Sequence, residues 1–262
     1  MMDGARLKAA LSAGERVCGT MFMSGKLPGE GDSQLGNLGL DYVIIDNEHS
    51  PYTRSDTARW ARRLTELGIT PVVRIPIPAP HYVTMALDLG AQGILAPYVE
   101  TIEQVQAVAG AAKYLPLKGE AVGRVVHQRE FPSEETRQYL TERNKNNFLI
   151  IGIESVAAIE RLDTLFGVDE VDAAFVGPND LTIQLGIPGQ YHHPDYLGAV
   201  DTILEGCRAH KIPLMIHFFN YEMAEPWINK GVNFVLFGTD RNGIGEQMQK
   251  DITHLRALPL VP

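Results

Sequence analysis

Two carboxylates follow neighbouring apolar runs of the sequence, at the points where strands would end. Glu154 closes the run FLIIGIE, and Asp180 follows the run AAFVG by three residues. Neighbouring strands lie about 4.8 Å apart, and carboxylates at that spacing repel each other unless a cation lies between them. Hard oxygen donors without a cysteine cluster favour Mg²⁺ or Mn²⁺, with Co²⁺ or Zn²⁺ as alternatives. We therefore predict that Glu154 and Asp180 bind a divalent metal.

An arginine and a histidine end two further apolar runs. Arg74 ends TPVVR, where it could stabilise a developing oxyanion or simply pair with a neighbouring acid. His49 follows YVIID, with two acids, Asp46 and Glu48, close before it, and could be a general base or a structural histidine. Either predicted metal ligand could instead cap the helix after its strand, a role that suits Asp180 well. The residues by themselves leave these alternatives open.

Eight short runs rich in Val, Ile, Leu and Phe recur along the whole chain. Their apolar residues are consecutive and do not alternate with polar ones, as in parallel strands buried on both faces. The predicted strands are Val17–Met23, Tyr42–Asp46, Pro71–Ile75, Gly93–Ala96, Phe148–Glu154, Ala173–Gly177, Pro213–Phe218 and Asn233–Gly238.

Segments of helical period separate most of these runs. Examples are Ser55–Leu67, Ile102–Lys113, Val156–Leu165 and Tyr196–Lys211. Strand then helix, repeated eight times, predicts an α/β fold of the (β/α)8 TIM-barrel class with its active site at the carboxyl ends of the strands. The alternative is a doubly wound sheet, but the first predicted strand is not followed by a glycine-rich dinucleotide-binding turn.

The chain contains no composition break, so we expect one domain over residues 1–262. Residues Pro116–Pro132 form the longest predicted irregular stretch, which we interpret as a functional loop. Among the other polar residues, Asp240 ends the eighth run, and His217 ends the seventh. We interpret His217 and the pair His192–His193 as structural.

Composition limits the partners. The net charge is −9, from 23 basic and 32 acidic residues, and no basic stretch could follow a phosphate backbone, so we expect no nucleic-acid partner. No apolar run approaches the roughly 20 residues of a membrane span. The amino-terminal segment lacks a secretory apolar core. Cys18 and Cys207 are predicted to be buried hydrophobic residues, with a single bridge as the alternative, and a cytoplasmic location is expected.

Five motifs in order resemble the metal-dependent pyruvate aldolases of the HpcH/HpaI family. The matching stretches are Asp46-Asn47-Glu48-His49-Ser50-Pro51, Pro71–Arg74, Ile153-Glu154, Gly177-Pro178-Asn179-Asp180-Leu181 and Gly238-Thr239-Asp240. The resemblance covers nearly the whole chain, from about Gly19 to Asp240. It implies a barrel of the phosphoenolpyruvate/pyruvate-domain type that cleaves a 4-hydroxy-2-oxo acid to pyruvate and an aldehyde.

The resemblance also implies residue roles. Glu154 and Asp180 would ligate the metal, and the backbone N–H groups of Asn179 and Asp180 would hold the substrate carboxylate. Arg74 would stabilise the enolate oxygen. His49 would move protons, and Asp88 corresponds to the acid that makes this histidine more basic. None of the strand ends carries a lysine, which argues against Schiff-base aldolases.

The chain departs from the family pattern at two places. A substrate-binding glutamine of the family is replaced by Gly152, so one substrate hydrogen bond is missing or is supplied elsewhere. In the loop after the fourth strand, Glu120 stands near the position of an arginine that faces the aldehyde, and Arg124 follows four residues later. A carboxylate at Glu120 would favour neutral hydroxyaldehydes; alternatively, Glu120 points into solvent and Arg124 takes the arginine's place.

Two other functions are weighed against the aldolase. An acyl-CoA lyase of the citrate-lyase β-subunit type would need a basic surface, for which only Lys118 and Arg124 are candidates. A non-catalytic small-molecule-binding barrel would have no need for the four chemistry-bearing residues together. The family also implies a homo-oligomer, a trimer or hexamer in which carboxyl-terminal helices are exchanged.

Overall fold

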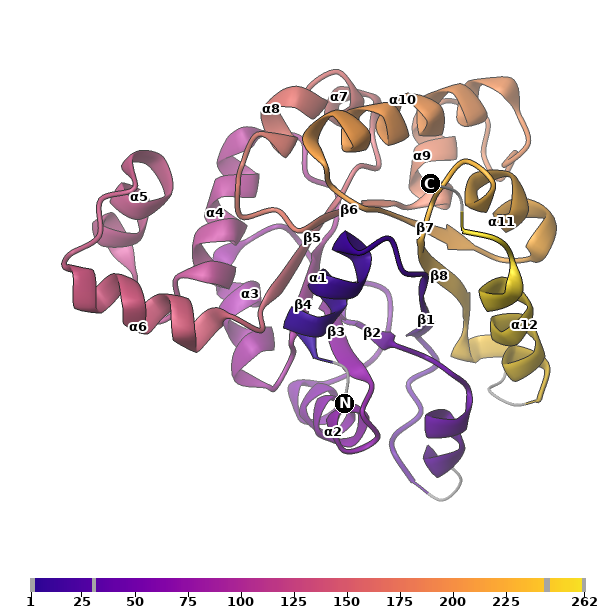
Figure 1. Ribbon diagram of the computed structural model, residues 1–262, viewed down its shortest axis with the longest axis horizontal. Coiled ribbons are helices and arrows are strands. Elements are labelled where there is room, and N and C mark those ends of the chain that lie inside the picture. Colours follow the sequence, from indigo (N-terminus) through magenta and orange to yellow (C-terminus); the bar gives the residue numbers. More distant parts are fainter. Residues whose placement is uncertain (1–2, 30–31, 243–245, 261–262) are drawn as a thin grey trace.

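The computed structural model describes residues 3–29, 32–242 and 246–260, and it contains a closed barrel of eight parallel strands in chain order (Figure 1). The strands are β1 Val17–Phe22, β2 Tyr42–Asp46, β3 Thr70–Arg74, β4 Gly93–Ala96, β5 Phe148–Gly152, β6 Ala173–Val176, β7 Leu214–Phe218 and β8 Phe234–Thr239. The predicted TIM barrel is confirmed. Two strands have the predicted bounds, and the others differ by one or two residues at an end.

Helices surround the barrel and return the chain to the amino end of each next strand. They are α1 Gly4–Ser12, α2 Arg54–Glu66, α3 Pro80–Asp88, α4 Ile102–Lys113, α5 Gly119–Gln128, α6 Glu134–Asn144, α7 Val156–Ile159, α8 Leu162–Phe166, α9 Pro178–Gln184, α10 Pro194–His210, α11 Tyr221–Ile228 and α12 Glu246–Ala257, with the 3-10 turns η1 Asp32–Asn37 and η2 Asp240–Asn242. Reciprocal capping boxes at Thr53 and Thr101 define the starts of α2 and α4. The single helix predicted over Val156–Leu165 is two short helices, because the backbone leaves the helical conformation at Arg161.

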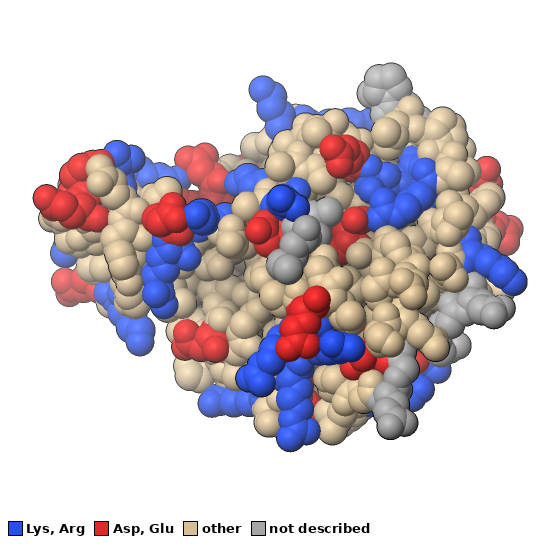
Figure 2. Space-filling model, turned by 60° about the horizontal axis from the view of Figure 1, so that its bottom comes forward, with Lys and Arg blue, Asp and Glu red and all other residues tan. Residues whose placement is uncertain are grey.

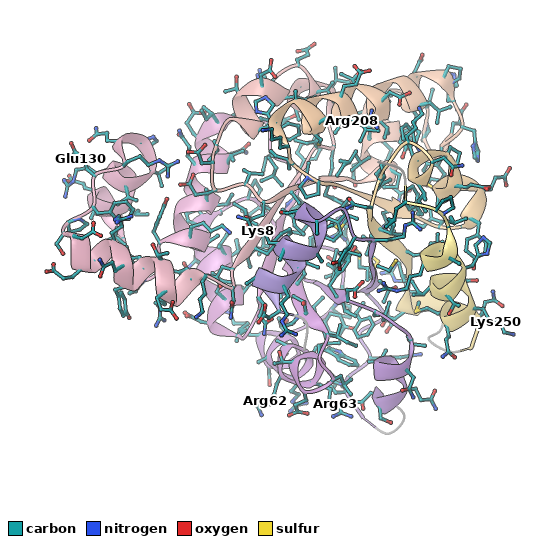
Figure 3. All side chains as sticks on the ribbon, in the orientation of Figure 1. Lys8, Arg62, Arg63, Glu130, Arg208 and Lys250 are labelled. Atoms are coloured by element: carbon teal, nitrogen blue, oxygen red, sulfur yellow. The ribbon has the colours of Figure 1, made fainter. Side chains whose placement is uncertain are left out.

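The barrel interior is filled by every second strand residue. This inner cluster includes Ile44, Val72, Leu95, Ile150, Phe175, Met215 and Leu236. Helix α1 closes the amino end of the barrel, since Leu7 and Leu11 join the same cluster. Lys8 of α1 lies over the strands in the centre of Figure 3. Side chains two residues further along each strand must therefore line the opposite, carboxyl end, which is the mouth.

The prediction of an irregular loop at Pro116–Pro132 is wrong, because α5 lies within it. Its glycines obscured a helical pattern that buries Val125. Gly110 of α4 permits close packing, since a Cβ there would lie 3.0 Å from the side chain of Val122. Helices α5 and α6 project from the barrel, and Glu130 lies at the outer end of this projection (Figures 1 and 3).

The carboxyl-terminal helix α12 packs on its own barrel. Ile252 and Leu255 are buried, and the guanidinium of Arg16 donates to the carbonyl oxygen of Leu255 at 2.7 Å. Cys18 and Cys207 are buried free thiols, as predicted. Burial raises the pKa of Cys18 to about 12. Acidic and basic side chains are interspersed over the face in Figure 2, and no described helix is long and apolar enough to cross a membrane.

Asp172, at the amino end of the barrel, provides a test of how the fold is held. Its carboxylate is buried, receives the backbone N–H of Leu149 at 2.8 Å and pairs with Lys8 at 2.6 Å and with the mostly buried Lys113. Asp172→Ala should lower the free energy of unfolding by about 3–5 kcal/mol, because it leaves a buried ammonium unpaired. Chemical denaturation measures the loss. Asp169→Ala, which removes an exposed partner of Arg129, should cost about 1 kcal/mol or less; equal losses would contradict the prediction.

Candidate active site

Three glycines lie at the mouth of the barrel. Gly152, Gly177 and Gly238 each stand two residues beyond an inner-cluster side chain, where a larger residue would fill the mouth. A Cβ at Gly177 would lie 2.2 Å from Oε1 of Glu154, so the glutamate carboxylate occupies the space above it. Gly238 has a φ of +60°, and a Cβ there would meet open space. The mouth is therefore open at Gly238, whereas the carboxylate of Glu154 fills the space at Gly177.

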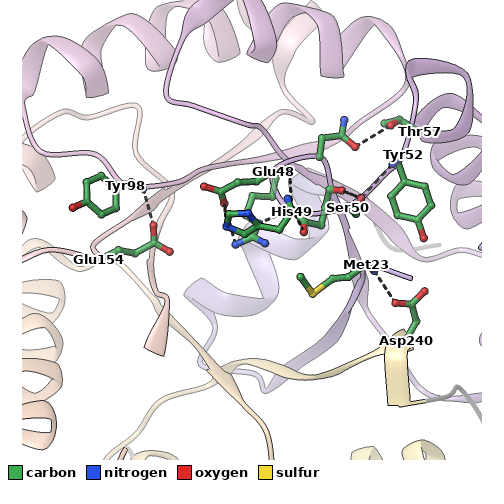
Figure 4. A network of polar contacts seen from close by, with 12 residues as sticks. Met23, Glu48, His49, Ser50, Tyr52, Thr57, Tyr98, Glu154 and Asp240 are labelled. Atoms are coloured by element: carbon green, nitrogen blue, oxygen red, sulfur yellow. Dashed lines mark hydrogen bonds and ion pairs between the residues drawn. The ribbon is translucent and has the colours of Figure 1, made fainter. Parts of the chain in front are cut away.

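The carboxylate of Glu154 is buried and only partly satisfied. Its Oε2 accepts the backbone N–H of Tyr98 at 2.8 Å, whereas Oε1 is buried without a hydrogen-bond partner among the described residues (Figure 4). Burial, followed by the charge of Asp180, raises the pKa of Glu154 to about 8. A buried, unpaired carboxylate oxygen beside a second carboxylate is the environment that a cation would stabilise.

Neither predicted metal ligand caps a helix. Helix α7 is capped by Ser155, and α9 has Gly177 at its N-cap without a side-chain hydrogen bond, so Asp180 lies in the first turn of α9. The capping alternative is therefore wrong for Glu154 and for Asp180. The described residues contain no group of three His, Cys, Asp or Glu suited to a metal, so this chain offers two carboxylates. Substrate and water oxygens would complete such a site.

Arg74 is buried at the mouth and held by two acids. Its Nε donates to Asp46 at 2.8 Å, and its Nη1 lies 3.1 Å from Oε2 of Glu48. Burial lowers the pKa of Arg74, but the hydrogen bond to Asp46 and the two acidic charges outweigh that effect and raise it. The arginine therefore pairs with neighbouring acids and is also fixed beside the open mouth.

His49 lies at the exposed rim, close to this network. Its backbone N–H donates to Asp46 at 3.2 Å, and its Nε2 lies 3.7 Å from Oε2 of Glu48, the oxygen that also faces Arg74 (Figure 4). The side chain of His49 is 57% exposed. Burial raises the pKa of Glu48, opposed by the charge of Arg74. Glu48 thus links the imidazole to the buried guanidinium.

The structure does not bring Asp88 to His49. Asp88 is the last residue of α3, which runs back toward the amino ends of the strands, and its side chain is exposed. Glu120 is also outside the mouth: its side chain is 96% exposed on α5, 3.9 Å from Arg124. Within this chain, the structure therefore places neither Asp88 beside His49 nor Glu120 in the mouth, because both side chains lie on helices outside the strand ends. The catalytic role of Asp88 stays a prediction, and exposure of Glu120 agrees with the alternative that it points into solvent.

Residues not selected from the sequence border the carboxylates. Tyr98, which follows β4 with a φ of +51°, positions Glu154 through its N–H, and its hydroxyl accepts from Gln184 of α9 at 2.8 Å. The hydroxyl of Tyr191 donates to Oδ1 of Asn179. The one sequence signal that pointed to Tyr98 was its position just after a predicted strand.

The remaining strand-end residues shape the mouth. Asp240 accepts the backbone N–H groups of Met23 at 2.7 Å and Ser24 at 3.0 Å, which joins the end of β1 to β8 (Figure 4). Nε2 of His217 lies 3.1 Å from the carbonyl oxygen of Gly238. Gly152 cannot replace a glutamine side chain, and a Cβ there would lie 3.0 Å from the backbone nitrogen of Tyr98.

The chain is similar to known proteins over most of its length. Residues 21–244 match the family model HpcH/HpaI aldolase/citrate lyase. A 2-keto-3-deoxy-L-rhamnonate aldolase from Salmonella gallinarum is 30% identical over 226 residues, covering 80% of this chain and 84% of that one. One from Klebsiella pneumoniae is 33% identical over 202 residues, covering 77% and 75%.

Solved structures agree with this similarity. The crystal structure of an HpcH/HpaI aldolase from Desulfitobacterium hafniense has a TM-score of 0.76 and 29% identity, covering 98% of this chain and 99% of that chain. A family protein from Burkholderia cenocepacia has a TM-score of 0.77 and 25% identity, with 96% and 99% covered. A citrate synthase, SbnG, is 24% identical with a TM-score of 0.76 and shows the shared fold.

The buried His217 makes stability depend on pH. Burial lowers its pKa from 6.5 to about 4, so between these values the unfolded chain binds a proton that the folded chain does not. Stability should therefore fall as pH drops from 6.5 to 4, by up to about 3 kcal/mol from this group. Urea titrations across this range should show a smaller loss for His217→Gln. An identical slope in the variant would refute the assignment.

Proposed function

The chain belongs to the HpcH/HpaI aldolase/citrate lyase family and is an aldolase, a carbon–carbon lyase; we propose that it cleaves a 4-hydroxy-2-oxo acid of the 2-keto-3-deoxy sugar-acid class to pyruvate and an aldehyde, reversibly and with a divalent metal. The relatives named 2-keto-3-deoxy-L-rhamnonate aldolase support this substrate class. The polar mouth supports it as well, since a hydroxylated acid needs hydrogen-bonding partners at both ends.

The observation that carries the proposal is the unpaired Oε1 of Glu154. It is buried, lies above Gly177, and is close enough to Asp180 for the charge of that residue to raise the pKa of Glu154. We propose these two carboxylates as ligands of Mg²⁺ or Mn²⁺, since the donor set consists of hard oxygens. When bound, the metal would supply Lewis-acid stabilisation of negative charge on the keto acid.

Arg74 and the start of α9 would orient the keto acid. The guanidinium, already fixed by Asp46 and Glu48, would donate to the oxygen at C2 as that oxygen gains charge. The backbone N–H groups of Asn179 and Asp180 are proposed for the substrate carboxylate. In support, α9 has no side-chain cap competing for its first N–H groups.

His49 would move the proton that cleavage releases. The C4 hydroxyl gives its proton to His49 as the C3–C4 bond breaks, the aldehyde forms, and the electron pair of that bond passes into the enolate of pyruvate. A proton returned to C3 completes the reaction. Exposure at the rim supports a place for His49 beside the outer part of the substrate, with its Nε2 3.7 Å from Oε2 of Glu48.

The proposal extends to further properties of the whole protein. We propose a cytoplasmic enzyme of one domain over residues 1–262, with small-molecule partners and without nucleic-acid or membrane partners. Two buried free thiols suit a reducing compartment. The family resemblance supports a homo-oligomer, a trimer or hexamer. The cations that an acyl-CoA lyase would use, Lys118 and Arg124, lie at α5, outside the mouth.

Pyruvate release from a panel of 4-hydroxy-2-oxo acids tests the function. The panel should include 2-keto-3-deoxy sugar acids and an acidic analogue, each assayed with chelator, Mg²⁺ or Mn²⁺. We expect metal-dependent pyruvate formation from the sugar acids. Metal-independent cleavage, or hydrolysis of an acyl-CoA without cleavage of any oxo acid, would overturn the proposal.

The metal assignment predicts that Glu154→Ala and Asp180→Ala each abolish Mn²⁺ binding in calorimetry while the barrel stays folded by circular dichroism. Each change removes one of two carboxylates, and the remaining one cannot hold the ion with comparable affinity. Glu120→Ala, which removes an exposed carboxylate on α5, is the matched control and should bind Mn²⁺ like the original protein. Unchanged affinity in either mouth variant would exclude that residue as a ligand.

The role of His49 predicts a division between two reactions. His49→Ala should slow cleavage by about 10²-fold or more, the usual contribution of a general base, because the C4 hydroxyl loses its proton acceptor. It should slow exchange of the pyruvate methyl protons less, since that reaction has no C4 hydroxyl. Cleavage is measured by pyruvate release and exchange by NMR in D₂O. Equal losses in the two assays would contradict the assigned step.

A further inference from the structure

His217 is a large side chain in the mouth that the proposed mechanism does not use. It follows the inner-cluster residue Met215 by two positions on β7, so it points into the barrel. The register places His217 opposite Leu236 of β8 and one position beyond the Val176–Ile216 pair, at the level of Gly177 of β6. His217 therefore has a residue without a side chain on its β6 side, where the carboxylate of Glu154 lies.

The contacts of His217 determine which ring nitrogen faces a ligand. Nε2 lies 3.1 Å from the carbonyl oxygen of Gly238, and because a carbonyl only accepts, this nitrogen carries the proton. The ring of Phe219 packs on the imidazole with centroids 4.7 Å apart and fixes its orientation. Burial lowers the pKa of His217, so the ring is neutral and its Nδ1 is a hydrogen-bond acceptor. No described residue donates to that nitrogen.

The depth of His217 indicates which part of a substrate it meets. His217 is buried, like Arg74 and Glu154, whereas His49 and Phe219 lie at the exposed rim. The three-carbon end of the substrate, held by the buried groups, is therefore the part within reach. Its C1 carboxylate and C2 oxygen already have partners in the proposed mechanism. C3 is the atom left to face β7.

We propose that Nδ1 of His217 accepts a hydrogen bond from a hydroxyl on C3 of the oxo acid, so that the enzyme uses 3-hydroxy-2-oxo acids as well as pyruvate. This inference rests on the proposed function and extends its substrate class. Once the substrate covers Nδ1, a methyl group at C3 would leave this acceptor unpaired, which is costly, whereas a hydroxyl would satisfy it. The hydroxyl also fits the open space above Gly238.

The test compares two donors, pyruvate and hydroxypyruvate, in Mn²⁺-dependent addition to the same aldehyde, glycolaldehyde. His217→Leu should lower kcat/KM for hydroxypyruvate relative to pyruvate by about 5- to 10-fold, the effect of one hydrogen bond to a neutral group. His217→Gln keeps a donor for Gly238 and an acceptor for the substrate, and its donor ratio should stay within about twofold of the original. His81→Leu, on α3, controls for loss of a histidine elsewhere and should not change the ratio.

The outcomes separate this inference from the proposed function. If the original enzyme uses neither donor, the proposed function and this inference both fail. If it uses pyruvate but the ratio is unchanged in His217→Leu, only the inference fails. His217→Met replaces the leucine variant if circular dichroism shows that the latter is unfolded, with the same ratio expected. Exchange of C3 protons into D₂O, measured for both donors without aldehyde, should show the same shift; a shift confined to aldehyde addition would overturn the inference.

Discussion

The buried carboxylate of Glu154 is the feature to which most of the mouth is adapted. Removing a charge from water is costly unless partners replace the lost solvation, and one oxygen of this carboxylate has no partner among the described residues. Gly177 makes room for it, Tyr98 holds its other oxygen, and Asp180 adds a second negative charge. A cation between the two acids would turn their repulsion into stabilisation, because each carboxylate would then be attracted to the ion that the other helps to bind.

The buried arginine and the two proposed metal ligands of the mouth come from different strands. On β3, Arg74 is held by Asp46 and Glu48, so its orientation is set before any substrate arrives. Across the barrel, the β5 and β6 ends provide the acids. A keto acid that carries negative charge at one end and develops it at C2 would meet both groups. Preorganised donors of this kind lower the energy of the charged state without rearrangement.

The outer helices mainly stabilise the fold. Asp172, with Lys8 and Lys113, ties α1 and α4 to the amino end of the barrel, far from the reacting groups. Asp240 joins the first and last strands at the opposite end. The projection formed by α5 and α6 carries exposed charged residues, including Glu120. Stability and chemistry are thus separated along the barrel axis, as the barrel geometry allows.

Local sequence determined the barrel and the identity of most groups at its mouth. Consecutive apolar residues in β2 and β4 specify buried parallel strands, and a polar residue that ends such a run, such as Arg74, must lie at the carboxyl end. Only the tertiary structure decided which of these groups meet. Whether Asp180 caps its helix, whether Glu120 faces the mouth and whether Asp88 reaches His49 depend on where the helices begin and how they pack, which contacts between distant segments decide. The depth of His217 likewise follows from the register of β7 against β6 and β8, a relation between residues distant in the chain.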